Sequence, residues 1–219
     1  MGPLPPQIVE TRLPVHDVTD AVYLEVLDDV ASALAGSGIP HCFIGGLASS
    51  VYGRDRHTHD LDLFVRPEDA DRTLEVLAGH GFEVERSCPD WIYKAAKRGL
   101  LVDVIFMTTD GTVLDPELEL HVRTAVFAGR KLPVIAPEDL LITKLSAFRE
   151  DTAHQWFDCV ALLESTELDW HYLMARAREK PHRLLSLLVF VAGSGRKLPA
   201  GVLEELFASV QRLGRERAA

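Results

Sequence analysis

The sequence has few cysteines, no long apolar run and no excess of positive charge, and each shortage excludes a class of protein. Only three of its 219 residues are cysteines, and Cys42, Cys88 and Cys159 form no CxxC pair. Neither a disulfide framework nor a thiolate zinc site is therefore indicated. No apolar run reaches the about 18 residues that cross a bilayer, and the N-terminus lacks a signal-peptide pattern. We expect a cytoplasmic protein with no membrane partner.

The shortage of positive charge bears on nucleic-acid binding. The chain has 23 Lys and Arg residues against 33 Asp and Glu residues, which gives a net charge of −10. This balance argues against a protein that holds nucleic acid chiefly by bulk charge, although it is compatible with a local basic patch. Apolar residues make up 47% of the chain, as in ordinary globular proteins with a buried core.

The hydrophobic pattern changes at Pro137. Before this residue helical spacing alternates with short strand patterns, and after it the spacing is helical only. We therefore predict an α/β (α+β) fold with a mixed core over residues 1–136 and a helical region over residues 137–219. The predicted strands are 41–44, 60–65, 82–85, 91–95, 100–106, 125–128 and 132–135. The predicted helices are one between a cap at Asp17 or Thr19 and Gly36, then 67–80, 137–149, 153–164, 170–179, 182–192 and 199–213.

The stretch from Gly45 to Val65 combines a glycine pair, two arginines and two aspartates. Side chains alternate along a strand, so Asp60 and Asp62 of DLDLFV face the same side. A glycine pair is often only a turn, and a D-x-D is often the solvent side of an edge strand. This strand is otherwise apolar, however, and two like charges on one face of a buried strand repel unless a cation or ligand compensates them.

A third carboxylate stands in a similar apolar pattern. Asp103 is the one charged residue of LLVDVIF, where an unpaired carboxylate is costly. Three carboxylates on adjacent strands would offer hard oxygen ligands, which suit Mg²⁺. The sequence therefore predicts a divalent-metal site formed by Asp60, Asp62 and Asp103.

Together these motifs resemble the DNA polymerase β-like nucleotidyltransferase superfamily. Gly46 is followed by thirteen residues and then by D-L-D, with an isolated aspartate later in the chain. RHTHDLDL, residues 56–63, is similar to the R-x-T-x-D-hydrophobic-D-hydrophobic form of small bacterial members, above all the AbiEii-type toxin nucleotidyltransferases. APEDLLITKL, residues 136–145, resembles their P-E-D-L-x-x-x-K helix. The resemblance covers about Phe43 to Leu163.

The resemblance implies a mixed-sheet nucleotidyltransferase core and transfer of NMP from ATP or another NTP to an acceptor hydroxyl. It implies that Asp60 and Asp62 hold two Mg²⁺ ions and that Asp103 holds the ion that activates the hydroxyl. Backbone N–H groups of Gly45 and Gly46 would approach the triphosphate, where a Cβ would obstruct them.

Further residues are assigned to the nucleotide by the same resemblance. Arg54, Arg56 and Lys144 are expected to neutralise phosphate charge. Asp158 carries over from a K-D-x-x-D motif that reads H-Q-W-F-D here. Their ordinary alternative is a solvated loop for the arginines and an exposed helix position for the lysine. Many relatives also have Ser where this chain has Gly46, so a hydroxyl contact to phosphate is lost.

The acceptor stays open at this point. The toxin-like resemblance implies transfer RNA as the acceptor and a cognate antitoxin as a partner, within a toxin-antitoxin pair. The alternatives are a small-molecule, antibiotic-modifying nucleotidyltransferase and a non-catalytic nucleotide-binding protein of the same fold. Basic residues of the helical region form either an RNA surface or ordinary solvated faces: Arg176, Arg178, Lys180, His182, Arg183, Arg212, Arg215 and Arg217.

Overall fold

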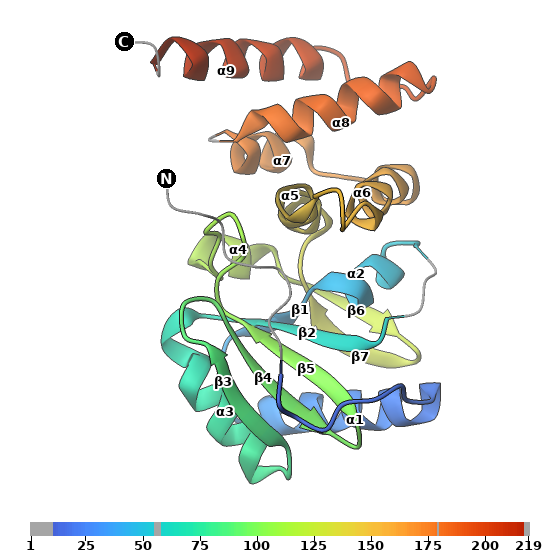
Figure 1. The fold of residues 1–219 in the computed structure, drawn as a ribbon. Helices are drawn as coiled ribbons and strands as arrows, with labels where there is room; N and C mark the ends of the chain where they lie inside the picture. Colours follow the sequence, from blue (N-terminus) through green and yellow to red (C-terminus); the bar gives the residue numbers. More distant parts are fainter. Residues whose placement is uncertain (1–10, 55–57, 179, 217–219) are drawn as a thin grey trace. The chain divides into compact units, whose positions relative to one another are not determined.

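The computed structural model describes residues 11–54, 58–178 and 180–216. The chain divides into two compact units, Met1–Ala136 and Pro137–Ala219, and Figure 1 labels the elements of each. The first unit contains all strands of the described chain, and the second is helical. The mixed α/β fold that the sequence predicts is confirmed.

A seven-stranded mixed sheet forms the framework of the first unit. Its strand order is β3-β4-β5-β2-β1-β7-β6. The pairs β2–β5 and β1–β7 are parallel, and the other neighbours are antiparallel. The strands are β1 (His41–Phe43), β2 (Asp60–Val65), β3 (Glu83–Cys88), β4 (Ile92–Lys97), β5 (Leu100–Ile105), β6 (Arg123–Phe127) and β7 (Arg130–Val134).

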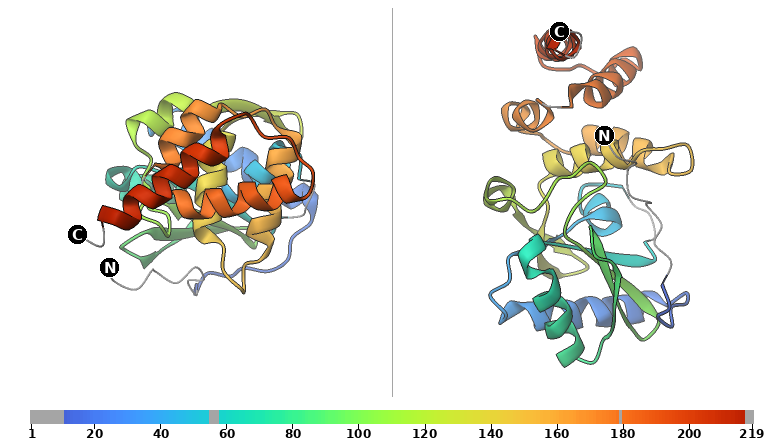
Figure 2. Two further views of the ribbon diagram at one scale, coloured as in Figure 1. Left: turned by 90° about the horizontal axis from the view of Figure 1, so that it is seen from above. Right: turned by 60° about the vertical axis from the view of Figure 1, so that its left-hand side comes forward.

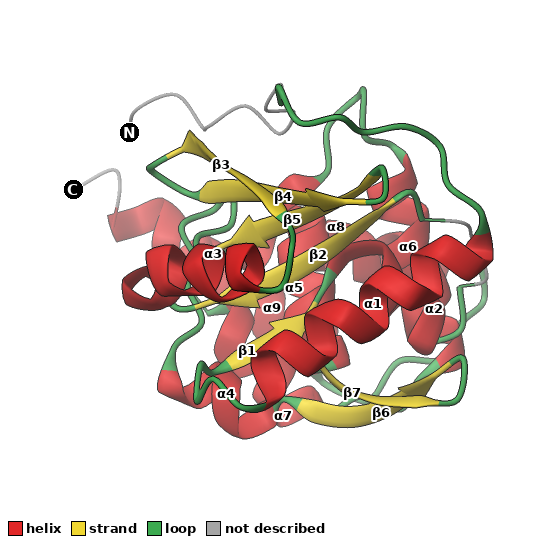
Figure 3. Cartoon of the chain, turned by 90° about the horizontal axis from the view of Figure 1, so that it is seen from below, coloured by secondary structure: helices red, strands yellow, loops and turns green. Residues whose placement is uncertain are grey.

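Two helices cover one face of this sheet, as Figures 2 and 3 show: α1 (Asp20–Ala35) and α3 (Ala70–Gly79). The Thr19 side chain caps α1 by accepting a hydrogen bond from the N–H of Val22, and the apolar stripe of α1 is buried. On the opposite face lies the short helix α2 (Gly45–Val51), which packs on β2 and β6.

Two short elements complete the first unit. The 3₁₀ turn η1 (Pro67–Asp69) leads into α3, and α4 (Pro116–His121) precedes β6. Helix α4 is absent from the sequence prediction, because it has only one buried side chain, Leu118, and therefore no apolar periodicity. Its start is fixed locally, since the Asp115 side chain accepts a hydrogen bond from the N–H of Leu118.

The second unit consists of helices packed in pairs. Helix α5 packs against α6, α7 and α8, and α8 packs against α9. Their bounds are α5 (Pro137–Ala147), α6 (His154–Ser165), α7 (Trp170–Ala177), α8 (Pro181–Gly193) and α9 (Val202–Glu216), each within a few residues of the predicted range. Among the described residues, no helix combines the length and the apolar character needed to cross a membrane.

Candidate active site

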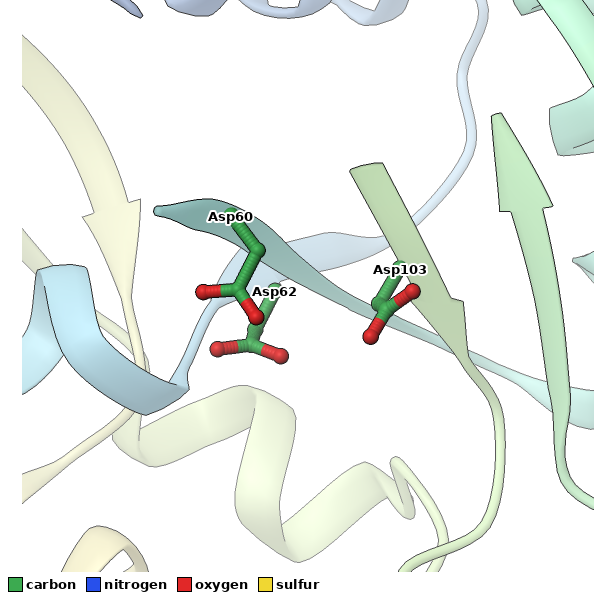
Figure 4. A group of neighbouring side chains, drawn as sticks. All are labelled: Asp60, Asp62 and Asp103. Carbon is green, nitrogen blue, oxygen red and sulfur yellow. The ribbon is translucent and has the colours of Figure 1, made fainter. Parts of the chain in front are cut away.

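The three predicted carboxylates lie together on one face of the sheet. In the parallel pair β2–β5, Asp62 is directly opposite Asp103, and Asp60 precedes Asp62 by one period of the strand. One oxygen atom from each of the three side chains lies within 4.8 Å of the other two. Figure 4 shows the three carboxylates side by side on the two strands. The structure therefore brings Asp60, Asp62 and Asp103 together.

The strand that carries two of these carboxylates is anchored by its other face. Leu61 and Leu63 are completely buried, and they alternate with the half-buried Asp60 and Asp62. This period-two pattern fixes the direction of both carboxylates, because turning either one inward would expose a core leucine.

The glycine pair at the start of α2 lets the protein's own side chains approach closely. Gly45 has a φ of +62°, and a Cβ there would lie 1.7 Å from Oδ2 of Asp62. A Cβ on Gly46 would lie 2.3 Å from Oγ1 of Thr58, whose hydroxyl donates to Oδ1 of Asp60 at 3.0 Å. The sequence explained these glycines by the approach of a phosphate. The structure adds that Gly45 makes room for the carboxylate of Asp62, and that Gly46 makes room for Thr58, which holds the carboxylate of Asp60.

Asp103 has a partner that the sequence analysis missed. The Lys94 ammonium on β4 donates to Oδ1 of Asp103 at 2.7 Å, and Lys94 lies directly opposite Asp103 in the antiparallel pair β4–β5. The signal is visible in the sequence as a single lysine inside the apolar run WIYKAA. A strand pattern alone does not say which group such a charge would meet.

Burial and charge both act on the titratable groups of this site. Burial raises the pKa of Asp103, the Lys94 ammonium opposes this rise, and the negative charge of Asp60 adds to it. Burial, reinforced by Asp62 and Asp60, also raises the pKa of the Tyr23 hydroxyl far above its ordinary value. Tyr23 therefore stays a neutral hydroxyl beside the carboxylates, and within the described chain its oxygen has no hydrogen-bond partner.

The structure describes one of the two predicted arginines. Arg54 follows α2 and is half-buried, and its backbone N–H donates to the carbonyl of Ser49 at 3.0 Å. Arg56 lies outside the described residues. Their assignment to phosphate binding stays a prediction.

Lys144 and Asp158 belong to the second unit, where they pair with each other. Lys144 Nζ donates to Oδ2 of Asp158 at 2.7 Å and to Oε1 of Gln155 at 3.0 Å. The Lys144 side chain is only 4% exposed, so the alternative that placed it on an exposed helix face is wrong.

The basic residues of the helical region do not all face outward. Arg176 forms an ion pair with Asp139 at 2.7 Å, and Asp139 also accepts a hydrogen bond from Tyr172 at 2.7 Å. Arg183 donates to the backbone carbonyls of Leu145 and Phe148. Both arginines thus hold segments of the second unit together, but Arg183 remains exposed, so the choice between an RNA surface and solvated faces stays open.

A known protein family matches most of this chain. A family described as "Uncharacterised nucleotidyltransferase" matches residues 10–192. The chain belongs to this nucleotidyltransferase family. No curated protein matches this nucleotidyltransferase. The sequence-based resemblance is thus confirmed at the level of nucleotidyltransferases, and the AbiEii-type subfamily stays a prediction.

Solved structures with a similar fold include other nucleotidyltransferases. The solution structure of the antibiotic-resistance factor ANT(2'')-Ia is 16% identical, covers 76% of this chain and 96% of its own, and has a TM-score of 0.54. ANT(2'')-Ia in complex with adenylyl-2''-tobramycin is 18% identical, with 73% and 98% coverage and a TM-score of 0.52. TM1012 from Thermotoga maritima is 22% identical, with 66% and 96% coverage and a TM-score of 0.49. At these identities the likeness concerns the fold alone.

Proposed function

We propose that this nucleotidyltransferase transfers NMP from an NTP to an acceptor hydroxyl at the carboxylate cluster of Asp60, Asp62 and Asp103. The observation that carries the proposal is the pairing of Asp62 with Asp103 in the β2–β5 ladder, with Asp60 on the same face. Three ionised carboxylates within 4.8 Å repel one another, and the single Lys94 ammonium balances only one of their charges, so the cluster suits a ligand that brings positive charge.

The donor set fits a hard divalent cation. All three side chains offer carboxylate oxygens and none offers sulfur, which matches the preference of Mg²⁺. When bound, Mg²⁺ would supply charge neutralisation for the phosphates and would favour ionisation of the acceptor hydroxyl. We propose Asp60 and Asp62 as ligands of two such ions and Asp103 as a ligand of one.

The residues of the first unit then divide the work of the reaction. Thr58 holds the carboxylate of Asp60 by its hydrogen bond, and Gly45 leaves the space in which the carboxylate of Asp62 lies. Oδ1 of Asp103 accepts a hydrogen bond from Lys94 and keeps a second lone pair that would hold the metal ion, which leaves Oδ2 to accept the proton of the acceptor hydroxyl. The hydroxyl oxygen forms a bond to the α-phosphorus while the bond to the leaving pyrophosphate breaks.

Residues outside this cluster enter the proposal through the family resemblance. We expect the backbone at Gly46 and the side chains of Arg54 and Arg56 to contact the nucleotide. We also expect Lys144, held by Asp158, to contribute to NTP binding. An ammonium has three N–H donors, and Asp158 and Gln155 take two of those of Lys144.

Transfer assays with each of the four α-labelled NTPs test the proposal. Label would be sought in a transfer-RNA fraction, which the toxin-like resemblance favours, and in a small-molecule fraction that includes aminoglycosides. The wild type should label one acceptor class in the presence of Mg²⁺, and Asp62→Asn, which keeps the shape of the side chain, should not. Label that appears equally with both proteins, or with neither, would contradict the proposed function.

A transfer-RNA acceptor would point to the toxin interpretation. Its companion expectation is an antitoxin encoded beside this chain, which would suppress the labelling when added. A small-molecule acceptor would instead place the protein with the antibiotic-modifying enzymes.

A further inference from the structure

Lys94 and Asp103 form an ion pair on two inner strands of the sheet, where buried charged side chains are unusual. Strand β4 lies between β3 and β5, and Lys94 shares one face of it with the buried residues Ile92 and Ala96. The Lys94 side chain is 5% exposed, and that of Asp103 is 15% exposed. Burying an ammonium here costs free energy, and apolar residues in place of both partners of a buried ion pair often give an equal or more stable protein. Stability alone does not explain the lysine.

Another ion pair on the same strand shows what an ordinary pair looks like. Lys97 at the end of β4 meets Asp29 of α1 at 2.7 Å, with side chains 20% and 32% exposed. That pair joins a helix to the sheet, and its aspartate is not part of the carboxylate cluster. Lys94, in contrast, is aimed at one member of a group of three carboxylates.

We propose that Lys94 is a positioning residue for NMP transfer: its ammonium holds Oδ1 of Asp103, so that the second oxygen keeps a fixed direction. This inference rests on the proposed function for its kinetic consequence. The hydrogen bond at 2.7 Å joins directly opposite residues of neighbouring strands, so the sheet itself sets the position of both groups.

The arrangement has a second consequence for the charge of the cluster. Three carboxylates and one ammonium carry a formal charge of −2 when all are ionised, and Lys94 is a cation that does not dissociate when metal does. Lys94 thereby compensates repulsion among the carboxylates while the site is empty of ligands. Removing it should leave metal attraction intact and disturb the orientation of Asp103.

Substitution of Lys94 separates these two contributions. We expect Lys94→Met to lower kcat by about 100-fold, the scale of a misplaced proton acceptor, while KM for the NTP changes by less than about 3-fold. Lys94→Arg should recover part of the loss, because a guanidinium keeps the charge but differs in length and shape. Lys97→Met is the matched control, and its kinetics should equal those of the wild type.

A double variant tests whether Lys94 acts through Asp103. In the Asp103→Asn background, Lys94→Met should cause no further loss of kcat beyond about 3-fold, because the group that it positions is already gone. Losses that multiply, or a Lys94→Met variant with wild-type kcat, would overturn the assignment.

Metal binding alone gives a readout that does not need turnover. Mn²⁺ titration followed by electron paramagnetic resonance should show Lys94→Met binding at least as tightly as wild type, since a nearby positive charge has been removed. Weaker binding together with an early melt would mean that Lys94 merely supports the structure, and would overturn the proposal.

The same set of proteins separates failure of this inference from failure of the proposed function. A wild type that transfers no NMP to any acceptor would refute the function, and the Mn²⁺ titration would still decide the role of Lys94. Should Lys94→Met not fold, Lys94→Gln retains an N–H donor for Asp103 without the charge. For Lys94→Gln too, we expect kcat to fall while KM for the NTP stays nearly unchanged.

Discussion

Each unit of the molecule contains one nearly buried lysine–aspartate pair, and the two pairs differ in their surroundings. Both have an N–O distance of 2.7 Å. In the first unit Asp103 keeps 15% of its side chain exposed and faces Asp60 and Asp62. In the second unit Asp158 is 1% exposed, and its partner Lys144 is also bound by Gln155.

This difference separates a group of charges that needs a ligand cation from a pair whose charges are already balanced. A carboxylate that is to meet a ligand must remain reachable, and the repulsion of its neighbours makes it gain from a cation. A sealed pair with complementary hydrogen bonds is balanced without a ligand, and removing one partner costs much stability. The difference predicts that substitutions in the first unit change activity most, and substitutions in the second unit change stability most.

The largest effect is expected from the carboxylate cluster. Asp60→Ala, Asp62→Ala and Asp103→Ala should each lower NMP transfer by at least about 1,000-fold, because each removes a ligand or proton acceptor of the reaction. Circular dichroism should show that each variant still folds. Near wild-type turnover in any one of the three would remove that residue from the site.

The next largest effect is expected from the sealed pair. Lys144→Met leaves Asp158 buried without its cation and should destabilise the protein by about 3–5 kcal/mol in denaturant unfolding. From the family resemblance we also expect KM for the NTP to rise in this variant. Lys94→Met should destabilise less, because Asp103 can regain water. Equal losses of stability would contradict the distinction between the two pairs.

A smaller effect is expected at the glycine that borders Asp62. Gly45→Ala should cost about 1–3 kcal/mol, from a positive φ and from the collision with the Asp62 carboxylate, and should also slow transfer. Gly111→Ala is the control, because its φ is +87° but a Cβ there meets nothing within 4 Å. Transfer should therefore fall only in Gly45→Ala.

The structure also changes what Gly46→Val should do. The resemblance places Gly46 beside the triphosphate, and on that ground alone Gly46→Val should cost nucleotide affinity more than stability. A Cβ at Gly46 would lie 2.3 Å from Thr58, so we now expect stability to fall as well. Calorimetry with Mg-NTP and thermal melting would measure the two losses separately.

The smallest effect concerns the repulsion within the metal-free cluster. The pKa of Asp103 is raised by burial and by Asp60, so its ionisation opposes folding. The stabilising contribution is complete below the ordinary value of about 4 and is lost as pH rises through the folded-state pKa. Asp60→Asn removes one cause of the shift.

We expect Asp60→Asn to melt about 2 °C above wild type in EDTA at pH 7, with a difference that shrinks as the pH falls toward 4. Asp90→Asn, in an exposed turn, is the control and should melt with the wild type. Identical melting of Asp60→Asn and wild type at every pH would show that these carboxylates do not interact.

Local pattern was enough to predict the elements that carry the site. The alternation in DLDLFV and the isolated aspartate of LLVDVIF predicted two strands and three carboxylates. The register that places Asp62 opposite Asp103 is a non-local pairing, and no spacing along the chain encodes it. The convergence of the cluster therefore required either the structure or the family resemblance.

The buried lysines Lys94 and Lys144 show the same limit of prediction from local sequence. A period-two or helical pattern states which face a residue occupies, but it cannot tell a solvated charge from one that meets a buried carboxylate. The sequence therefore left Lys94 out of the site and left the surroundings of Lys144 open for one reason: each partner lies on a different strand or helix. Helix α4 was missed because a single buried leucine carries no period.

The pairing of β2 with β5 also limits which sequence changes this protein can accept during evolution. A one-residue insertion or deletion within either strand would turn the following side chains to the opposite face and send a carboxylate into the core. Exchange of one residue for another alters a single group and leaves the alignment unchanged. A Cβ on Gly129, in the turn between β6 and β7, would meet nothing within 4 Å, so this turn accepts a change of length more easily than either strand does. Variants that keep the activity should therefore differ in length at turns of this kind and only in residue identity along β2 and β5.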